Sequence, residues 1–196
     1  MARIGYKKAK FNVADKSTGK YKTATEGVPK LERVIDEKFS PEFNSAELYA
    51  DDVLAESDYA FKKGTLAITM ADDDDKVIAQ LLGNEVATEP NGGEVTQKVS
   101  DTAPEIGYGH IVTKMVKGVR QYKVEFFPRV KVTKVTTDAK TRGDGNEFGT
   151  TALEGTVMPL DAEFNGMAEG TWEMHQTFDT EAKAETYLDA CLTPAT

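Results

Sequence analysis

Alternating hydrophobic and polar positions run through most of this sequence and predict a protein built mainly from β-strands. Leu66, Ile68 and Met70 alternate with Thr and Ala residues, which is the period of two expected of a half-buried strand. The same kind of pattern predicts further strands, which cover residues 4–13, 31–39, 94–99, 106–116, 119–135, 151–159 and 170–178. Residues 117–118 join two of these into a long hairpin, and Pro128 indicates an edge strand or a bulge in its second arm.

Two segments show the spacing of amphipathic helices instead. The first ends at Gly83, a residue suited to the left-handed conformation after a helix, and its apolar face comprises Val77, Ile78, Leu81 and Leu82. The second is capped by Asp179 or Thr180 and stops at Pro194, and its apolar stripe comprises Tyr187, Leu188, Cys191 and Leu192. We therefore expect an α+β protein, mainly β: one domain over residues 1–196, an antiparallel β-sandwich or barrel with one internal helix and one C-terminal helix.

Two stretches break the pattern and predict loops. Residues 39–58 contain Pro41 and Asn44 together with several acidic residues, and we expect a long loop with an extended middle at residues 48–49. A loop of about 20 residues is uncommon in a compact domain and is usually functional. Residues 138–147 predict a second, polar loop.

The charge balance narrows the class of partner. The 196 residues include 24 Lys and Arg against 33 Asp and Glu, which gives a formal net charge of −9. An acidic chain does not hold nucleic acid through its phosphates, although it suits a surface that stands close to DNA without binding it. No apolar run approaches the roughly 18 residues of a membrane-spanning helix, and the first residues carry no secretion signal. We expect no membrane partner and synthesis in the cytoplasm.

Residues with catalytic chemistry are scarce. The sequence has two histidines, His110 and His175, and one cysteine, Cys191, on the apolar stripe of the last helix. It contains no nucleophile-elbow or zinc-protease motif, and the acidic residues of the 39–58 stretch have no spacing that defines a hydrolase pair. These patterns predict a structural or interaction protein that is not an enzyme and uses no cofactor.

Four consecutive aspartates, residues 72–75, precede the first helix. Successive side chains on a helix point about 100° apart, so these carboxylates do not converge on one ion. We expect Asp72 or Asp73 to cap the helix, because an aspartate accepts a hydrogen bond from the free N–H groups there. The alternative is a calcium-dependent β-sandwich module that binds carbohydrate or a cell surface through residues 72–75 or through Asp144–Glu147.

Five segments share a pattern with one protein family; they are Ile4–Lys10, Leu48–Asp52 with Glu56, Gly64–Met70, the helix that ends at Gly83, and Leu153–Pro159. In these segments the chain resembles the major tail proteins of long-tailed, non-contractile bacteriophages, which are the subunits of the tail tube. Together the segments sample most of the chain, and the stretch from Leu48 through the helix is the most specific of them.

The resemblance implies a fold of the tail tube type and a structural role in the virion tail. Such subunits form hexameric rings that stack into a tube, through which the phage genome passes into the host. The implied partners are other copies of the chain and tail proteins such as the tape measure and the tail terminator, while DNA passes through the lumen without specific binding. The long loop is expected to contact a neighbouring subunit or ring through Phe43, Leu48, Tyr49, Asp51 and Asp52.

Overall fold

The computed structural model of the chain describes residues 2–24, 27–50, 53–71, 74–87, 93–137 and 149–195. Within these residues the protein is mainly β, with two helices, as the sequence predicts. The elements in chain order are β1 (Ala2–Asp15), β2 (Lys20–Tyr21), β3 (Lys30–Leu31), β4 (Val34–Ala50), β5 (Val53–Met70), α1 (Asp75–Leu82), β6 (Glu85–Val86), β7 (Val95–Thr96), β8 (Glu105–Val116), β9 (Val119–Thr137), β10 (Thr151–Val157), β11 (Met174–Phe178) and α2 (Glu181–Leu192).

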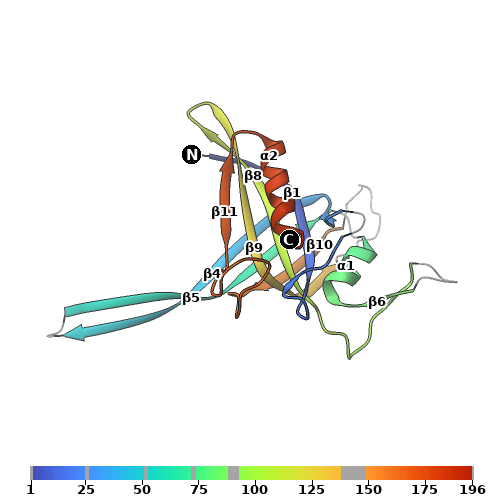
Figure 1. The fold of residues 1–196 in the computed structure, drawn as a ribbon, viewed down its shortest axis with the longest axis horizontal. Coiled ribbons are helices and arrows are strands. Elements are labelled where there is room, and N and C mark those ends of the chain that lie inside the picture. The colour runs from blue at the N-terminus through green and yellow to red at the C-terminus, as the bar shows by residue number, and fades with distance from the viewer. Residues whose placement is uncertain are drawn as a thin grey trace, which may run out of the picture.

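One large antiparallel sheet organises the molecule. Nine of the described strands belong to it, in the order β2-β1-β8-β9-β10-β5-β4, with β3 paired to β1 and β11 paired to β9. The short strands β6 and β7 form a separate ribbon. The α2 helix lies across β1, β8 and β9, and the β4–β5 hairpin extends from the opposite end of the strand order (Figure 1).

The 19-residue strand β9 is central and serves two hydrophobic cores. It pairs with β8 on one side and with β11 and then β10 on the other. Pro128 lies at a bulge: Tyr108 pairs with Phe127 but Ile106 pairs with Val130, so β9 has one extra residue there. Of the two predicted alternatives, edge strand or bulge, the bulge is therefore the one observed.

The first core lies beneath α2. Val124 and Phe126 of β9 pack there against Leu188 and Leu192 of the helix, and all four side chains are fully buried. Gly109 of β8 allows this close approach, because a Cβ atom there would lie 2.6 Å from Leu188 Cδ1. Thr180 is the N-cap of α2 and accepts from the Lys183 amide, so the second of the two expected cap residues is correct.

The second core lies where β5, β10 and the rest of β9 meet. Its buried side chains include Leu66, Ile68, Val130, Val132 and Leu153. The α1 helix adds the buried Leu81, and Gly83 ends that helix in the left-handed conformation at φ 74°, as predicted. Each such side chain contributes roughly 1.5–3 kcal/mol through its removal from water.

The predicted long loop at residues 39–58 is wrong. The described part of this stretch belongs to β4 and β5, which pair from Val34 opposite Met70 to Ala50 opposite Val53, with three register shifts along the way. Pro41 is compatible with β4 because this strand has one partner in the described sheet, so the N–H that proline lacks is not needed for a second ladder.

Other boundaries also shift. The expected strand at 31–39 is broken at Arg33, whose φ of 50° separates β3 from β4. The strands expected at 94–99 and 170–178 are shorter, Val95–Thr96 and Met174–Phe178. The predicted polar loop at 138–147 and the calcium candidate Asp144–Glu147 lie outside the described residues.

Candidate functional site: the projecting hairpin and the cleft at its root

Half of the β4–β5 hairpin projects beyond the sheet. The β10 strand pairs with β5 from Gly64 to Met70, so the part of β5 before Gly64 has β4 as its backbone partner among the described strands. Figure 1 shows this two-stranded ribbon standing clear of the body. At about 3.3 Å per residue, a strand of the length of β4 spans roughly 55 Å.

This ribbon is poorly supported within one chain. Two strands without a third strand or a helix against them are marginally stable in water. The outer edges of the ribbon also present N–H and C=O groups that no described strand pairs. Edges of this kind are usually covered, charged or paired with another chain.

The near part of the ribbon carries exposed aromatic side chains. Phe43 is 50% exposed and Tyr59 is 62% exposed. Phe43 contacts Phe61 edge-on with ring centroids 6.0 Å apart, and Phe61 stacks on Trp172 at 4.1 Å. This aromatic contact anchors the ribbon to the body and leaves one side of Phe43 and Tyr59 open to a partner.

Aromatic packing continues inward at the root of the hairpin. The Phe39 ring lies 4.7 Å from that of Phe127 and 5.9 Å from that of Trp172. Gly64 provides the space for the ring, because a Cβ atom there would lie 2.3 Å from Phe39 Cε2. The root is therefore tightly packed where the ribbon leaves the sheet.

Three of the five residues predicted to contact a neighbour lie in β4, and two lie outside the described residues. Phe43 lies on the projecting ribbon and is exposed. Leu48 and Tyr49 belong to β4, where their backbones pair opposite Glu56 and Leu54. Asp51 and Asp52 lie outside the described residues.

Charge is unevenly divided between this hairpin and the turn of the β8–β9 hairpin. Residues 41–63 contain six Asp and Glu but two Lys. The β8–β9 turn contains Lys114, Lys117 and Arg120, beside the 62% exposed Val119. Burial, together with repulsion from nearby Lys123 and Arg3, lowers the pKa of Lys114, which indicates that positive charges gather there.

A polar cluster lies in a cleft of about 570 Å³ at the hairpin root. His110 of β8 is 3% exposed and has a carboxylate on each side: its Nδ1 lies 3.2 Å from Glu37 Oε2 and its Nε2 lies 3.3 Å from Glu125 Oε2. The Tyr6 ring of β1 stacks on the imidazole at 4.7 Å. Strands β1, β4, β8 and β9 therefore meet at one buried histidine.

Hydrogen bonds extend this cluster in two directions. The Tyr108 hydroxyl donates to Glu37 at 2.7 Å and hydrogen-bonds to the Tyr6 hydroxyl. Burial raises the pKa of both tyrosines, so they remain neutral.

Glu125 receives cationic donors on the other side of the cluster. It accepts from Arg3 at 2.9 Å and from Lys123 at 2.6 Å. Burial opposes ionisation of Glu125, but the hydrogen bonds and charges of His110 and Lys123 outweigh it and lower the pKa to about 2.

Sequence reasoning missed this cluster. The alternation of β9 assigns Glu125 to the polar face of the strand, whereas Glu125 is buried beside His110. One signal of the cluster was present in the sequence. His110 is the single histidine of the long hairpin, and the charged Glu125 is its direct cross-strand partner.

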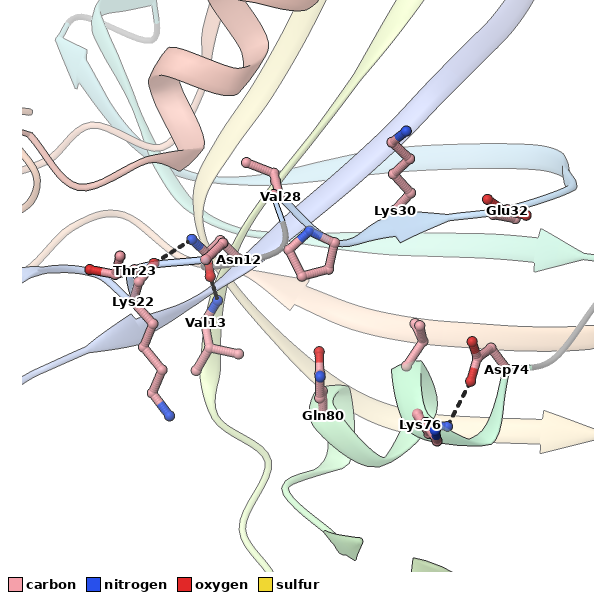
Figure 2. Close-up of a pocket in the computed structure, with 14 residues that line it drawn as sticks. Asn12, Val13, Lys22, Thr23, Val28, Lys30, Glu32, Asp74, Lys76 and Gln80 are labelled. Atoms are coloured by element: carbon pink, nitrogen blue, oxygen red, sulfur yellow. Dashed lines mark hydrogen bonds between the residues drawn. The ribbon is translucent and has the colours of Figure 1, made fainter. Parts of the chain in front are cut away.

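A second cleft, of about 740 Å³, lies between β1, the segment around β3, and α1 (Figure 2). Asn12 donates to the Lys22 carbonyl oxygen at 2.8 Å and accepts from the Val13 amide at 2.8 Å. Figure 2 shows the Lys22 and Lys30 side chains pointing in different directions, so their ammonium groups do not converge.

The same cleft contains the cap of α1, and here the prediction needs correction. The N-cap is Asp74, which accepts from the Lys76 amide at 2.9 Å, and not Asp72 or Asp73, which lie outside the described residues. The helix begins at Asp75, so Asp74 is the carboxylate in position to meet the free amides of the first turn.

A metal-binding cluster and a membrane-spanning helix are both absent from the described residues. In this part of the chain no three His, Cys, Asp or Glu side chains are grouped so as to hold a metal ion. Neither of the two described helices is long and apolar enough to cross a membrane. No protein-family model matches the sequence, and no curated protein matches it significantly.

Proposed function

We propose that this protein is a structural subunit of a phage tail tube, in which copies of the chain form stacked hexameric rings around a channel for the genome. The observation that carries the proposal is the β4–β5 ribbon, which leaves the sheet at Gly64 with open edges and exposed aromatic residues. A ribbon of this kind gains support when a second copy covers it.

Charge complementarity favours a second copy as the occupant. The acidic ribbon and the basic β8–β9 turn lie on different parts of the chain, so a head-to-tail contact brings opposite charges together. Contacts of this heterologous type generate rings or filaments and are not limited to dimers. The overall charge of −9 suits a channel that repels DNA from its wall.

The segments that carry the family resemblance are consistent with this proposal. Gly64–Met70 is the body half of β5, and it pairs along its length with β10, which contains most of Leu153–Pro159. Two of the segments are thus neighbouring strands at the base of the ribbon. The same proposal places the protein in the virion tail and gives it no catalytic role. Its further partners would be the tape measure and the tail terminator, and DNA would pass through the channel.

Negative-stain electron microscopy and light scattering of the full chain test the proposal over a range of concentrations. We expect rings or tubes to accumulate as the concentration rises. In a shortened variant, residues 46–58 are replaced by Asn-Gly, which joins the direct partners Ser45 and Tyr59 through a two-residue turn. This variant should remain folded, with a melting temperature within about 4 °C of the wild type, and should not assemble.

The matched control is Val99→Ser, which changes a fully exposed apolar residue outside the hairpin and should assemble like the wild type. A wild-type chain that stays monomeric at every concentration, also with tail initiator components added, would contradict the proposal. If the shortened variant assembled, the projecting ribbon would not be needed for assembly, and that part of the proposal would be wrong.

A further inference from the structure

We infer that His110 acts as a protonation-dependent latch, whose charge fastens strand β4 at the root of the projecting hairpin to the body of the protein. The inference goes beyond the proposed function and concerns the single chain, so it does not depend on assembly.

The latch joins three strands through buried groups. Glu37 comes from β4, His110 from β8 and Glu125 from β9, and their side chains are 6%, 3% and 10% exposed. The two imidazole nitrogens lie 3.2 Å and 3.3 Å from carboxylate oxygens on opposite sides of the ring. Glu37 lies four residues before Pro41, close to the point where the ribbon leaves the sheet.

The chemistry of imidazole makes this arrangement dependent on a proton. A neutral imidazole has one N–H and one lone pair, whereas the imidazolium has an N–H on each nitrogen. Loss of the proton therefore turns one nitrogen lone pair toward a carboxylate oxygen at little more than 3 Å. In a buried site this exchanges an attraction for a repulsion and is costly.

Glu37 is the partner that this change affects most. Glu125 keeps Arg3 and Lys123 as cationic donors when His110 is neutral. Among the described residues, Glu37 has His110 as its cationic partner within ion-pair distance and otherwise accepts from the neutral Tyr108 hydroxyl. Nδ1 of His110 also has no well-aligned hydrogen bond, so its contact with Glu37 is chiefly electrostatic.

Backbone pairing limits how far the latch can open. On its inner side β4 remains hydrogen-bonded to β5, and β5 remains paired with β10. Loss of the Glu37 contact therefore loosens β4 locally and does not detach the hairpin. Aromatic packing of Phe39 at the root is a further side-chain anchor of this strand.

Charged and titratable groups surround the imidazole on every strand packed against it. They are Arg3 and Tyr6 of β1, Asp36 and Glu37 of β4, Tyr108 of β8, Lys123 and Glu125 of β9, and Glu173 before β11, with Lys114 of β8 beside Lys123 and Arg3. Histidine is the side chain whose charge ordinarily changes between about pH 5 and pH 8. The pKa of Glu125 lies near 2, and burial raises those of Tyr6 and Tyr108, so these three groups keep their charge state in that range.

Hydrogen exchange followed by mass spectrometry tests the latch, at concentrations where the chain is monomeric and with correction for the intrinsic pH dependence of exchange. Between about pH 5 and pH 8 we expect the protection of peptides from the Val34–Phe43 part of β4 to fall about tenfold relative to peptides from α2. His110→Gln should abolish this pH-dependent fall in protection. Glu37→Gln should reduce it, because an amide can hydrogen-bond to a neutral imidazole.

The matched control is His175→Gln, which replaces the other histidine of the chain and should keep the full step. If His110→Gln does not fold, ¹⁵N chemical shifts of the wild-type imidazole rings give the titration of His110 directly, and β4 protection should follow that curve. The latch would be overturned if the protection of β4 were equal across the pH range, or if its fall followed the titration of His175 instead. Neither outcome bears on tube assembly.

Discussion

The two long hairpins of this protein, β8–β9 and β4–β5, have the same antiparallel pairing but different surroundings. The first lies in the middle of the sheet, with β1 on one side and β10 and β11 on the other. The second lies at the end of the strand order, and half of it projects beyond any described third strand. One hairpin contributes to both cores, whereas the outer half of the other has no third strand beside it among the described residues.

The same contrast, between a buried part and an exposed part, is found along the β4–β5 hairpin itself. Next to β10, Leu66, Ile68 and Met70 are buried in the second core. Farther out, Phe43 and Tyr59 are at least half exposed. The stability of the monomer should therefore depend on β8–β9 and the inner half of β5, while assembly should depend on the outer ribbon.

The largest expected effect is a loss of stability in the central hairpin. Phe126→Ala removes a fully buried ring that packs beneath α2, and it should lower the free energy of unfolding by about 3–5 kcal/mol. Urea unfolding followed by circular dichroism measures this loss. Val119→Ala, at the exposed turn of the same hairpin, is the control and should change stability by less than about 0.5 kcal/mol. A loss below about 1 kcal/mol for Phe126→Ala would contradict the central role of β9.

The central hairpin was predictable from the sequence for a physical reason. Its second strand, β9, alternates because Tyr122, Val124 and Phe126 pack into the core beneath α2. Its turn residues Lys117 and Gly118 both have positive φ, as a tight two-residue hairpin requires. The C-terminal helix was predictable for the corresponding reason, since Leu188 and Leu192 are one turn apart and fully buried. Burial of one face is what leaves a periodic pattern in a sequence.

The projecting hairpin lacks that pattern because no core imposes it. Pro41 and Asn44 are usual in loops but are tolerated in a strand with a free edge, so composition alone favoured a loop. The cluster around His110 was missed for a different reason, because its burial leaves no hydrophobic pattern in the sequence. Glu37, His110 and Glu125 are polar residues that become buried only because strands distant in sequence bring mutually compensating groups together.

An intermediate effect is expected where β5 ends and α1 begins. Asp74→Ala removes the carboxylate that accepts from the Lys76 amide and should cost about 0.5–2 kcal/mol of stability. Because capping uses a backbone N–H and no ion, this cost should be the same in calcium and in chelator. Thermal melts under both conditions measure it, with Asp75→Ala as the neighbouring control that leaves the cap in place.

A calcium-dependent shift of several degrees in the wild type, absent from variants of residues 72–75, would contradict the capping interpretation. It would instead favour the calcium-dependent binding module, because a ligand that binds only the folded state raises its melting temperature. The run of four aspartates also explains why the sequence analysis placed the cap of α1 at Asp72 or Asp73 and not at Asp74. All four have the same chemistry, and only the point where the helix begins distinguishes Asp74 from its neighbours.

The smallest effect on stability is expected on the projecting ribbon. Phe43→Ser leaves the backbone pairing intact and removes a half-exposed ring whose edge-on contact with Phe61 is worth about 0.5–1.5 kcal/mol. Urea unfolding should therefore show a loss of no more than about 1.5 kcal/mol, well below that of Phe126→Ala. Assembly should weaken strongly in the same variant, because the exposed side of Phe43 is the part left open to a second copy. Unchanged assembly would exclude Phe43 from the contact, and a loss of several kcal/mol would show that the ribbon is packed within its own chain.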